Sequence, residues 1–304
     1  MVKNHPKKQE KKQESKFLDK IKDYYYKEYK KLFWLTMILF LLSAVVIYNT
    51  YQKTGDFVKR DVSLKGGISI TIETGFSDIV LLEEILQSKH PGASISIRTV
   101  ESSGKVTGVI IEASDITQEE LVSTINELIP LTKENYNIES MGSTLGESFF
   151  QQIFIALIIA FIGMGLVFQL YFRNIYGTLA ALFSAFMDIF ITIGITNLLG
   201  IKLTAGGIAA FLMLIGYSID TSILLSTKLL KEQGDTRQGL FGAMKTGLTM
   251  SAAGIAAMGV SFLLTNNSSL KQIMLILVIG LVIDLITTWI GNVAFLRYYL
   301  EKRK

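Results

Sequence analysis

The chain has 304 residues, half of them hydrophobic, and a mean hydropathy of +0.41. This composition excludes an ordinary soluble domain and indicates runs of about 20 apolar residues that cross a bilayer. The absence of cysteine excludes disulfides and thiolate metal sites, and both histidines, His5 and His90, lie outside the apolar runs, which excludes a histidine metal site in the membrane. The net charge is only +4, so the placement of the charges is more informative than their sum.

Residues 1–31 form a lysine-rich segment directly before the first apolar run. Such a segment can bind nucleic acid, but before a span it is more often a cytoplasmic anchor, which is the interpretation we favour. Phe17, Ile21, Tyr24 and Tyr25 can share one face of a short helix, which indicates contact with membrane lipid. We therefore expect membrane lipid, and no nucleic acid, as a partner of this segment.

Apolar runs predict six membrane spans, at residues 32–51, 150–172, 176–199, 204–227, 247–265 and 272–296. Basic residues gather in the 228–246 loop and in the 297–304 tail, as they do before the first span. Because cytoplasmic loops carry the excess of lysine and arginine, we expect both termini and that loop in the cytoplasm. The sequence thus predicts a multi-pass protein of the cytoplasmic membrane, with residues 52–149 outside.

The 52–149 segment predicts a compact α+β domain. Ile68, Ile70 and Ile72 alternate as in a half-buried strand, and Thr117 begins a capped helix with an apolar stripe. The expected strands and helices lie at residues 62–73, 78–88, 93–100, 106–113, 115–130 and 135–141. Their order, β-α-β-β-α-β, is that of the ferredoxin-like fold, so the predicted fold class is an all-α bundle of six transmembrane helices with one extracytoplasmic ferredoxin-like domain.

Three aspartates fall within the predicted spans: Asp188, Asp220 and Asp284. An ionised aspartate at the bilayer centre costs on the order of 3 kcal/mol on insertion scales, so each must be protonated, hydrated or hydrogen-bonded to a neighbouring helix. Serines and threonines close to each aspartate in sequence are candidate donors for a purely structural role. The alternative is a proton-coupling role, and both interpretations stay open at this point.

Several kinds of chemistry are excluded by their missing motifs. Asp188 and Asp220 lack the sequence context of an intramembrane aspartyl protease, no His-Glu-x-x-His is present for a zinc protease, and no phosphate-binding glycine loop occurs. The sequence therefore predicts a protein that is not an enzyme and that has no catalytic residues, no metal and no cofactor.

Three passages carry a family resemblance. Gly66 and Gly67 close a short motif at the start of the outer domain, a Gly-rich stretch over 139–147 enters the second span, and the fourth span contains Gly216, Tyr217, Ser218, Ile219 and Asp220 in direct succession. Together they resemble the SecF members of the SecD/SecF family, within the RND superfamily and in its archaeal form. The resemblance covers nearly the whole chain, although no arginine enters the fifth span as in bacterial members.

This resemblance implies an RND-like half bundle that pairs with SecD, works with the SecY channel of the Sec translocon and promotes export of a translocating preprotein, with coupling to the proton gradient. It favours Asp220 as the protonation site, whereas we expect structural roles for Asp188 and Asp284. Two other functions remain open: half of an RND-type small-molecule transporter, and a purely structural translocon scaffold.

Overall fold

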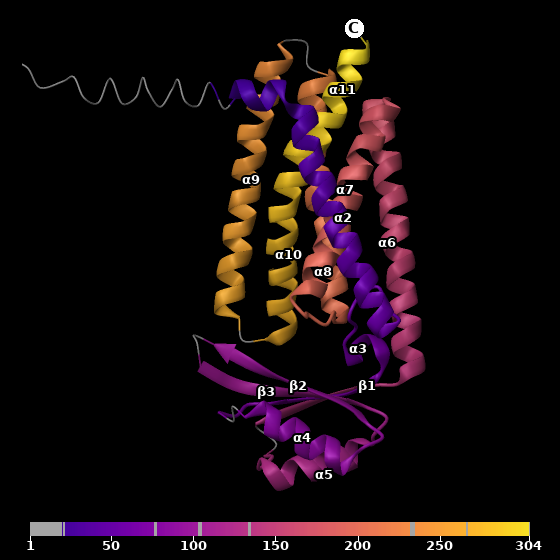
Figure 1. Cartoon of the computed structure of the whole chain (residues 1–304), viewed down its shortest axis with the longest axis vertical. Helices are drawn as coiled ribbons and strands as arrows, with labels where there is room; N and C mark the ends of the chain where they lie inside the picture. The colour runs from indigo at the N-terminus through magenta and orange to yellow at the C-terminus, as the bar shows by residue number, and fades with distance from the viewer. Residues whose placement is uncertain are drawn as a thin grey trace, which may run out of the picture.

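The computed structural model describes residues 20–303 except 21, 76–77, 103–104, 133–134, 232–234 and 266. It contains a bundle of long helices and, beyond one end of it, a small α+β domain (Figure 1). Most of the predicted basic segment, residues 1–31, lies outside the described residues. The predicted fold class is confirmed, because six of the described helices are long and apolar enough to cross a membrane.

The bundle has a buried centre and an exposed periphery. Its helices are α2 (Tyr29–Thr54), α6 (Ser143–Phe172), α7 (Ile175–Leu198), α8 (Ala205–Ser226), α9 (Thr236–Leu264) and α10 (Ser268–Ile286). The helices α7, α8 and α10 are largely buried inside the chain, whereas α2, α6 and α9 expose most of their residues. Two helices continue through π-helical turns: α8 into η1 (Thr227–Lys231), and α10 into η2 (Thr287–Asn292) and then α11 (Val293–Arg303).

The α+β domain has a four-stranded antiparallel sheet in the order β2-β3-β1-β4, as in a ferredoxin-like fold. Its elements are α3 (Val62–Lys65), β1 (Gly67–Ile72), α4 (Ile79–Lys89), β2 (Ser94–Ser102), β3 (Lys105–Ser114), α5 (Gln118–Leu128) and β4 (Tyr136–Met141). The alternating Ile68, Ile70 and Ile72 of β1 are buried against α4 and α5, which cover the distal face of the sheet (Figure 1). The predicted capping box of Thr117 and Glu120 is confirmed at the start of α5.

The other face of the sheet is turned toward the bundle (Figure 1). Alternation along β1 and β3 places Ser69, Thr71 and Glu112 on this face, opposite the isoleucines. The chain between α2 and α3 binds the α7–α8 turn through two backbone hydrogen bonds, one from Leu203 N to Lys59 O at 2.6 Å and one from Asp61 N to Leu203 O at 2.9 Å. The domain is thus seated on the bundle by backbone as well as by side chains.

Candidate functional site

Two of the three predicted aspartates meet in the centre of the bundle. Asp188 lies midway along α7 and Asp284 lies near the end of α10, and both side chains are fully buried. Their carboxyl groups interact directly with each other. Two carboxylates that meet at fully buried positions repel each other, so the ionisation of both together is strongly disfavoured.

The donors to this pair come from α8 and from the π-helical turn η2. Ser218 Oγ donates to Asp188 at 2.5 Å, and Thr287 Oγ1 donates to the same carboxyl group. Thr221 lies 3.2 Å from both Asp284 oxygens, and Thr288 donates to Asp284 at 2.8 Å. All four donors are neutral hydroxyls, and in the described part of the chain no lysine or arginine forms an ion pair with either aspartate.

Polar side chains continue from the pair toward the end of the bundle that carries α11. Ser184 lies 3.4 Å from Thr288, and Asn292 donates to Ser222 at 3.1 Å. Asn292 Oδ1 and Ser226 Oγ are buried without a hydrogen-bond partner among the described residues. Buried polar atoms of this kind are usual contacts for internal water. The π-helical turn η2 supplies Thr287, Thr288 and Asn292 to the pair and its polar surroundings. Such turns are frequent at functional sites.

Asp220 lies apart from the pair. Its side chain is exposed on the surface of α8, beside a crevice of about 240 Å³ that Met250, Ser251 and Gly254 of α9 also line. Ser218 and Thr221, its neighbours in sequence, donate to the other two aspartates instead. The structural alternative, in which Ser218 and Thr221 donate hydrogen bonds to Asp220, is therefore not found. Residues two positions apart on a helix, such as Ser218 and Asp220, point about 200° from each other.

The other residues of the fourth-span motif divide between two faces. Ser218 is buried at the aspartate pair, and Tyr217 and Ile219 are half-buried. Gly216 faces open space, because a Cβ added there would meet nothing within 4 Å. Gly216 is thus not needed for close packing against the described residues of this chain.

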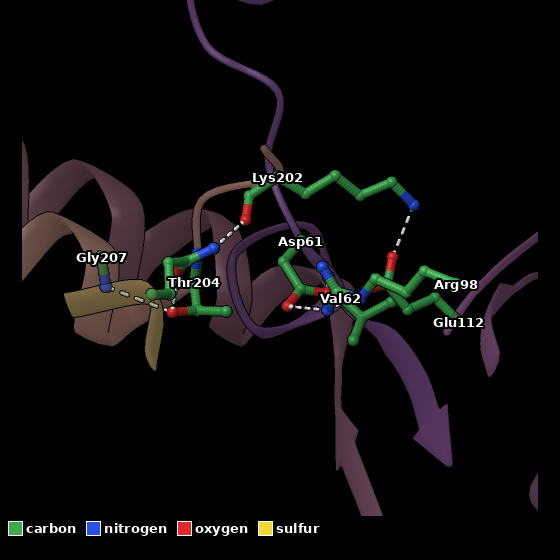
Figure 2. A network of polar contacts seen from close by, with 8 residues as sticks. Asp61, Val62, Arg98, Glu112, Lys202, Thr204 and Gly207 are labelled. Atoms are coloured by element: carbon green, nitrogen blue, oxygen red, sulfur yellow. Dashed lines mark hydrogen bonds and ion pairs between the residues drawn. The ribbon is translucent and has the colours of Figure 1, made fainter. Parts of the chain in front are cut away.

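A second polar cluster joins the α+β domain to the bundle (Figure 2). Glu112 of β3 is 4% exposed and accepts a hydrogen bond of 2.5 Å from Lys202 on the α7–α8 turn. Arg98 of β2 forms a 2.6 Å ion pair with Glu112 and donates a hydrogen bond of 3.5 Å to Asp61. Sequence analysis missed Glu112, for which the only signal was a single acid in the apolar run from Val109 to Ala113.

The α7–α8 turn is also hydrogen-bonded to the bundle, through Gln272 of α10. Gln272 donates to the carbonyl oxygen of Lys202 and accepts from Thr204 Oγ1 at 2.5 Å. Thr204 in turn caps α8 by accepting from Gly207 N at 3.1 Å. A contact to Glu112 in the α+β domain therefore continues through the turn into α8 and α10. These helices, with η2, carry the donors and one member of the aspartate pair.

Asp61 is the acid of this junction whose pKa is shifted. It caps α3 by accepting from Val62 N at 2.5 Å, and its side chain is buried. Burial and the neighbouring Glu112 raise the pKa of Asp61 to about 6, against the opposing effect of Arg98. Protonation of Asp61 is thus within reach of mildly acidic conditions.

The glycines of the first two motifs lie against each other. Gly66 and Gly67 have φ angles of +87° and +131°, which side chains rarely adopt, and a Cβ on Gly67 would lie 2.6 Å from Ala113 O. A Cβ on Gly146 of α6 would lie 2.8 Å from Gly66 N. Gly66 and Gly67 thus belong to the turn where α3, β1 and α6 make close backbone contact.

Comparison with known proteins agrees with the motifs. The family described as "Protein export membrane protein SecD/SecF, C-terminal" matches residues 121–302. The SecF protein of Pyrococcus furiosus is 35% identical, with 90% of this chain and 92% of that protein aligned, and SecF of Methanocaldococcus jannaschii is 33% identical, with 91% and 97% aligned. The chain belongs to the SecD/SecF family. It is a SecF-type auxiliary component of Sec protein export and a multi-pass membrane protein.

The fold has a known structural counterpart. The crystal structure of SecDF from Thermus thermophilus, described as a translocon-associated membrane protein, superposes with a TM-score of 0.73 at 19% identity. The alignment covers 91% of this chain but only 38% of that longer chain. At this identity the likeness concerns the fold alone, and it leaves most of the SecDF chain without a counterpart here.

Proposed function

We propose that this SecF-type chain works with a SecD-type partner and the Sec channel, and that proton binding at the Asp188–Asp284 pair changes how α7, α8 and α10 pack. The role of the aspartate pair is supported by one observation: both carboxyl groups are fully buried, and their side-chain donors among the described residues are hydroxyl groups. Loss of a proton would leave a second uncompensated charge in the bundle, which favours a rearranged, hydrated packing. The hydrogen-bonded α7–α8 turn would carry that rearrangement to the outer domain.

The partner would cover the exposed face of α8. Ala209, Met213, Gly216 and Asp220 are all exposed and recur at intervals of three to four residues, so they form one stripe along the helix. Small residues in such a stripe allow a neighbouring helix to approach closely, and an aspartate facing lipid is costly. Replacing Gly216 by tryptophan should prevent co-purification of a SecD-type partner, whereas Leu170→Trp on the exposed surface of α6 should not.

The α+β domain would lie outside the cell, with both described chain ends in the cytoplasm. The first residues of α2 and the C-terminal α11 share the end of the bundle opposite the domain, which supports this arrangement (Figure 1). Because the chain has no cysteine, single cysteines report sidedness cleanly. A membrane-impermeant maleimide should label Thr107→Cys, but not Gln238→Cys, in intact cells, and the reverse pattern would overturn the orientation.

The proton-coupling proposal is tested by export into inverted membrane vesicles with and without a proton gradient. We expect Asp188→Asn combined with Asp284→Asn to abolish the gradient-dependent stimulation while the chain stays folded and paired. The family resemblance favours Asp220 as the protonation site, so Asp220→Asn tests this partner-facing acid in the same assay. Asp115→Asn in the α+β domain is the matched control. Undiminished stimulation in the double variant would remove the buried pair from the mechanism.

A further inference from the structure

Two rows of buried polar side chains lead from the aspartate pair toward the end of the bundle that carries α11. One row lies on α8 and the other on α10 and η2, and each has a polar residue at every fourth position: Ser218, Ser222 and Ser226, and Asp284, Thr288 and Asn292. Residues four apart lie on one face of a helix. The hydrogen bond from Asn292 to Ser222 shows that the two polar faces meet.

Apolar packing closes the rows on the other side of the pair. Leu214, four residues before Ser218, is fully buried and packs against Gly280, four residues before Asp284. A Cβ added at Gly280 would lie 2.5 Å from a methyl carbon of Leu214, so the two helices are in close contact at this level. The two rows therefore extend from the pair in one direction, toward the α11 end.

The far end of the rows has hydrogen-bonding capacity that the described residues do not use. Asn292 Oδ1 and Ser226 Oγ have no hydrogen-bond partner among them, although Asn292 is only 3% exposed and Ser226 is 0% exposed. Buried polar atoms of this kind bind internal water where there is room for it. A continuous chain of hydroxyl groups, an amide and water is also the usual setting of a proton relay inside a membrane protein.

Residues 22–28, which precede α2, cover this end of the rows and are called the gate segment here. The segment lies across the end of the bundle beside α9 (Figure 1). The hydroxyl group of Tyr25 donates to the carbonyl oxygen of Trp289, three residues before Asn292. The rings of Tyr25 and Tyr26 pack against the buried apolar cluster that η1, η2 and α11 form beyond the rows.

The gate segment is fastened to the bundle by a few polar contacts. Arg297 of α11 donates to the carbonyl oxygen of Tyr26, and its guanidinium group lies 3.8 Å from the centre of the Tyr26 ring. Asp23 forms an ion pair with Arg237 of α9, and both side chains are partly exposed. Because exposed ion pairs hold weakly, the segment can leave the bundle while the helices stay packed.

We propose that the two rows form the route by which water and protons reach the aspartate pair, and that the gate segment closes this route at the α11 end. With the segment displaced, water enters between Ser226 and Asn292 and completes a hydrogen-bonded chain through Thr288 to Asp284. The use of the route by protons rests on the proton binding proposed above for the pair. The closure by the gate segment does not.

The closure is tested by thiol modification of the full-length chain in lipid nanodiscs, where both ends of the bundle face water. Because the chain has no cysteine, Ser226→Cys places a single thiol at the end of the rows. Thr196→Cys places one at an equally buried position of α7, on the α+β-domain side of the pair. Tyr25→Ala removes the gate contact, and Tyr24→Ala, at an exposed tyrosine of the same segment, is the matched control. Mass spectrometry follows the reaction with a positively charged methanethiosulfonate.

We expect position 226 to react about tenfold faster with Tyr25→Ala, because loss of a hydrogen bond and of a packed ring shifts the gate toward its open state by about that factor. Tyr24→Ala should leave the rate unchanged, and position 196 should react slowly in every background. Tyr25→Phe, which keeps the ring and loses only the hydroxyl group, should give a smaller acceleration in a chain that is less perturbed. Unchanged rates at position 226 in both Tyr25 variants, or equal acceleration at position 196, would overturn the gate.

The proton route is tested separately, in the export assay with and without a proton gradient. Asn292→Leu keeps the size of the side chain but interrupts the row, so the gradient-dependent stimulation should be lost. Thr249→Val on the exposed surface of α9 is the control. Undiminished stimulation with Asn292→Leu, where the double aspartate variant has lost it, would overturn the route and leave the proposed function intact. If the double aspartate variant keeps the stimulation, the proton route falls with the proposed function, and the thiol rates still decide the gate.

Discussion

The bundle and the junction each bury two carboxyl groups, but they compensate them in different ways. Among the described residues, the side-chain donors to Asp188 and Asp284 are neutral hydroxyls, whereas Glu112 pairs with Arg98 and Lys202, and Asp61 with Arg98. The chain can place long cations at the junction because that region borders water and their stems reach inward from the rim. Inside the bundle a cation would cost as much as the acid it neutralises.

The difference teaches that buried acids can serve two purposes in one chain. An acid that forms ion pairs with cations, such as Glu112, holds two parts of the molecule together, as at the α7–α8 turn. An acid surrounded by neutral hydroxyls has no cation to balance a negative charge, so a charge there depends on hydrogen bonds alone. Substitutions that separate charge from hydrogen bonding therefore distinguish the two regions.

The largest effect is expected from Asp188→Ala. This change leaves a cavity and removes the acceptor of Ser218 and Thr287, so the free energy of unfolding should fall by about 4 kcal/mol. Asp188→Asn keeps the volume and an acceptor oxygen, so its loss should stay below about 1 kcal/mol. Denaturant unfolding of the purified chain in mixed micelles measures both. Equal losses would mean that Asp188 is ionised, and the contrast between the two regions would disappear.

Glu112→Gln should have the next largest effect. It leaves Arg98 and Lys202 without their shared carboxylate at a buried position, which costs about 3 kcal/mol. Hydrogen exchange should quicken in β3 and in the α7–α8 turn but not around Asp284. High salt should weaken the wild-type junction in the same places because its cations are partly exposed, and an unchanged exchange pattern would contradict the proposed role of this ion cluster.

Asp61 should make the junction pH-dependent. Its pKa of about 6 in the folded chain lies above the ordinary value of 3.8, so the native state holds the proton more tightly than the unfolded chain does. Stability contributed by Asp61 is therefore full below about pH 4, falls as the pH rises to 6, and is constant above that, a change of about 3 kcal/mol. The unfolding free energy of Asp61→Asn, which keeps a capping oxygen, should lack this dependence. Parallel pH profiles of variant and wild type would refute the assignment.

The smallest effect is expected from Thr288→Val. It removes one hydroxyl donor to Asp284 but leaves Thr221 in place, so a loss of about 0.6 kcal/mol is typical of such bonds in membranes. Thr249→Val is the control, since Thr249 is exposed and donates only to a carbonyl of its own helix. A loss of several kcal/mol at Thr288 would show that the aspartate pair depends on all its donors together.

The sequence alone predicted the six spans, the β-α-β-β-α-β order of the α+β domain and the family. It was wrong at residues 62–65, which it placed in the first strand and which form the short helix α3 instead. The features that it predicted depend on local patterns: apolar runs long enough to cross a bilayer, the alternation of Ile68, Ile70 and Ile72, the Thr117 cap, and short motifs such as Gly216 to Asp220. All are properties of residues close together in the chain, so they could be predicted without knowing how the helices pack.

Only the tertiary structure decided which acid meets which donor. The sequence placed hydroxyls beside each aspartate, but helix rotation turns Ser218 and Thr221 away from Asp220 and toward α7 and α10. The π-helical turn likewise brings Thr287 to Asp188, 99 positions away in the chain. Glu112 and Lys202 also meet across 90 positions. Such contacts depend on how packed helices and sheet are rotated and seated, which no local pattern specifies.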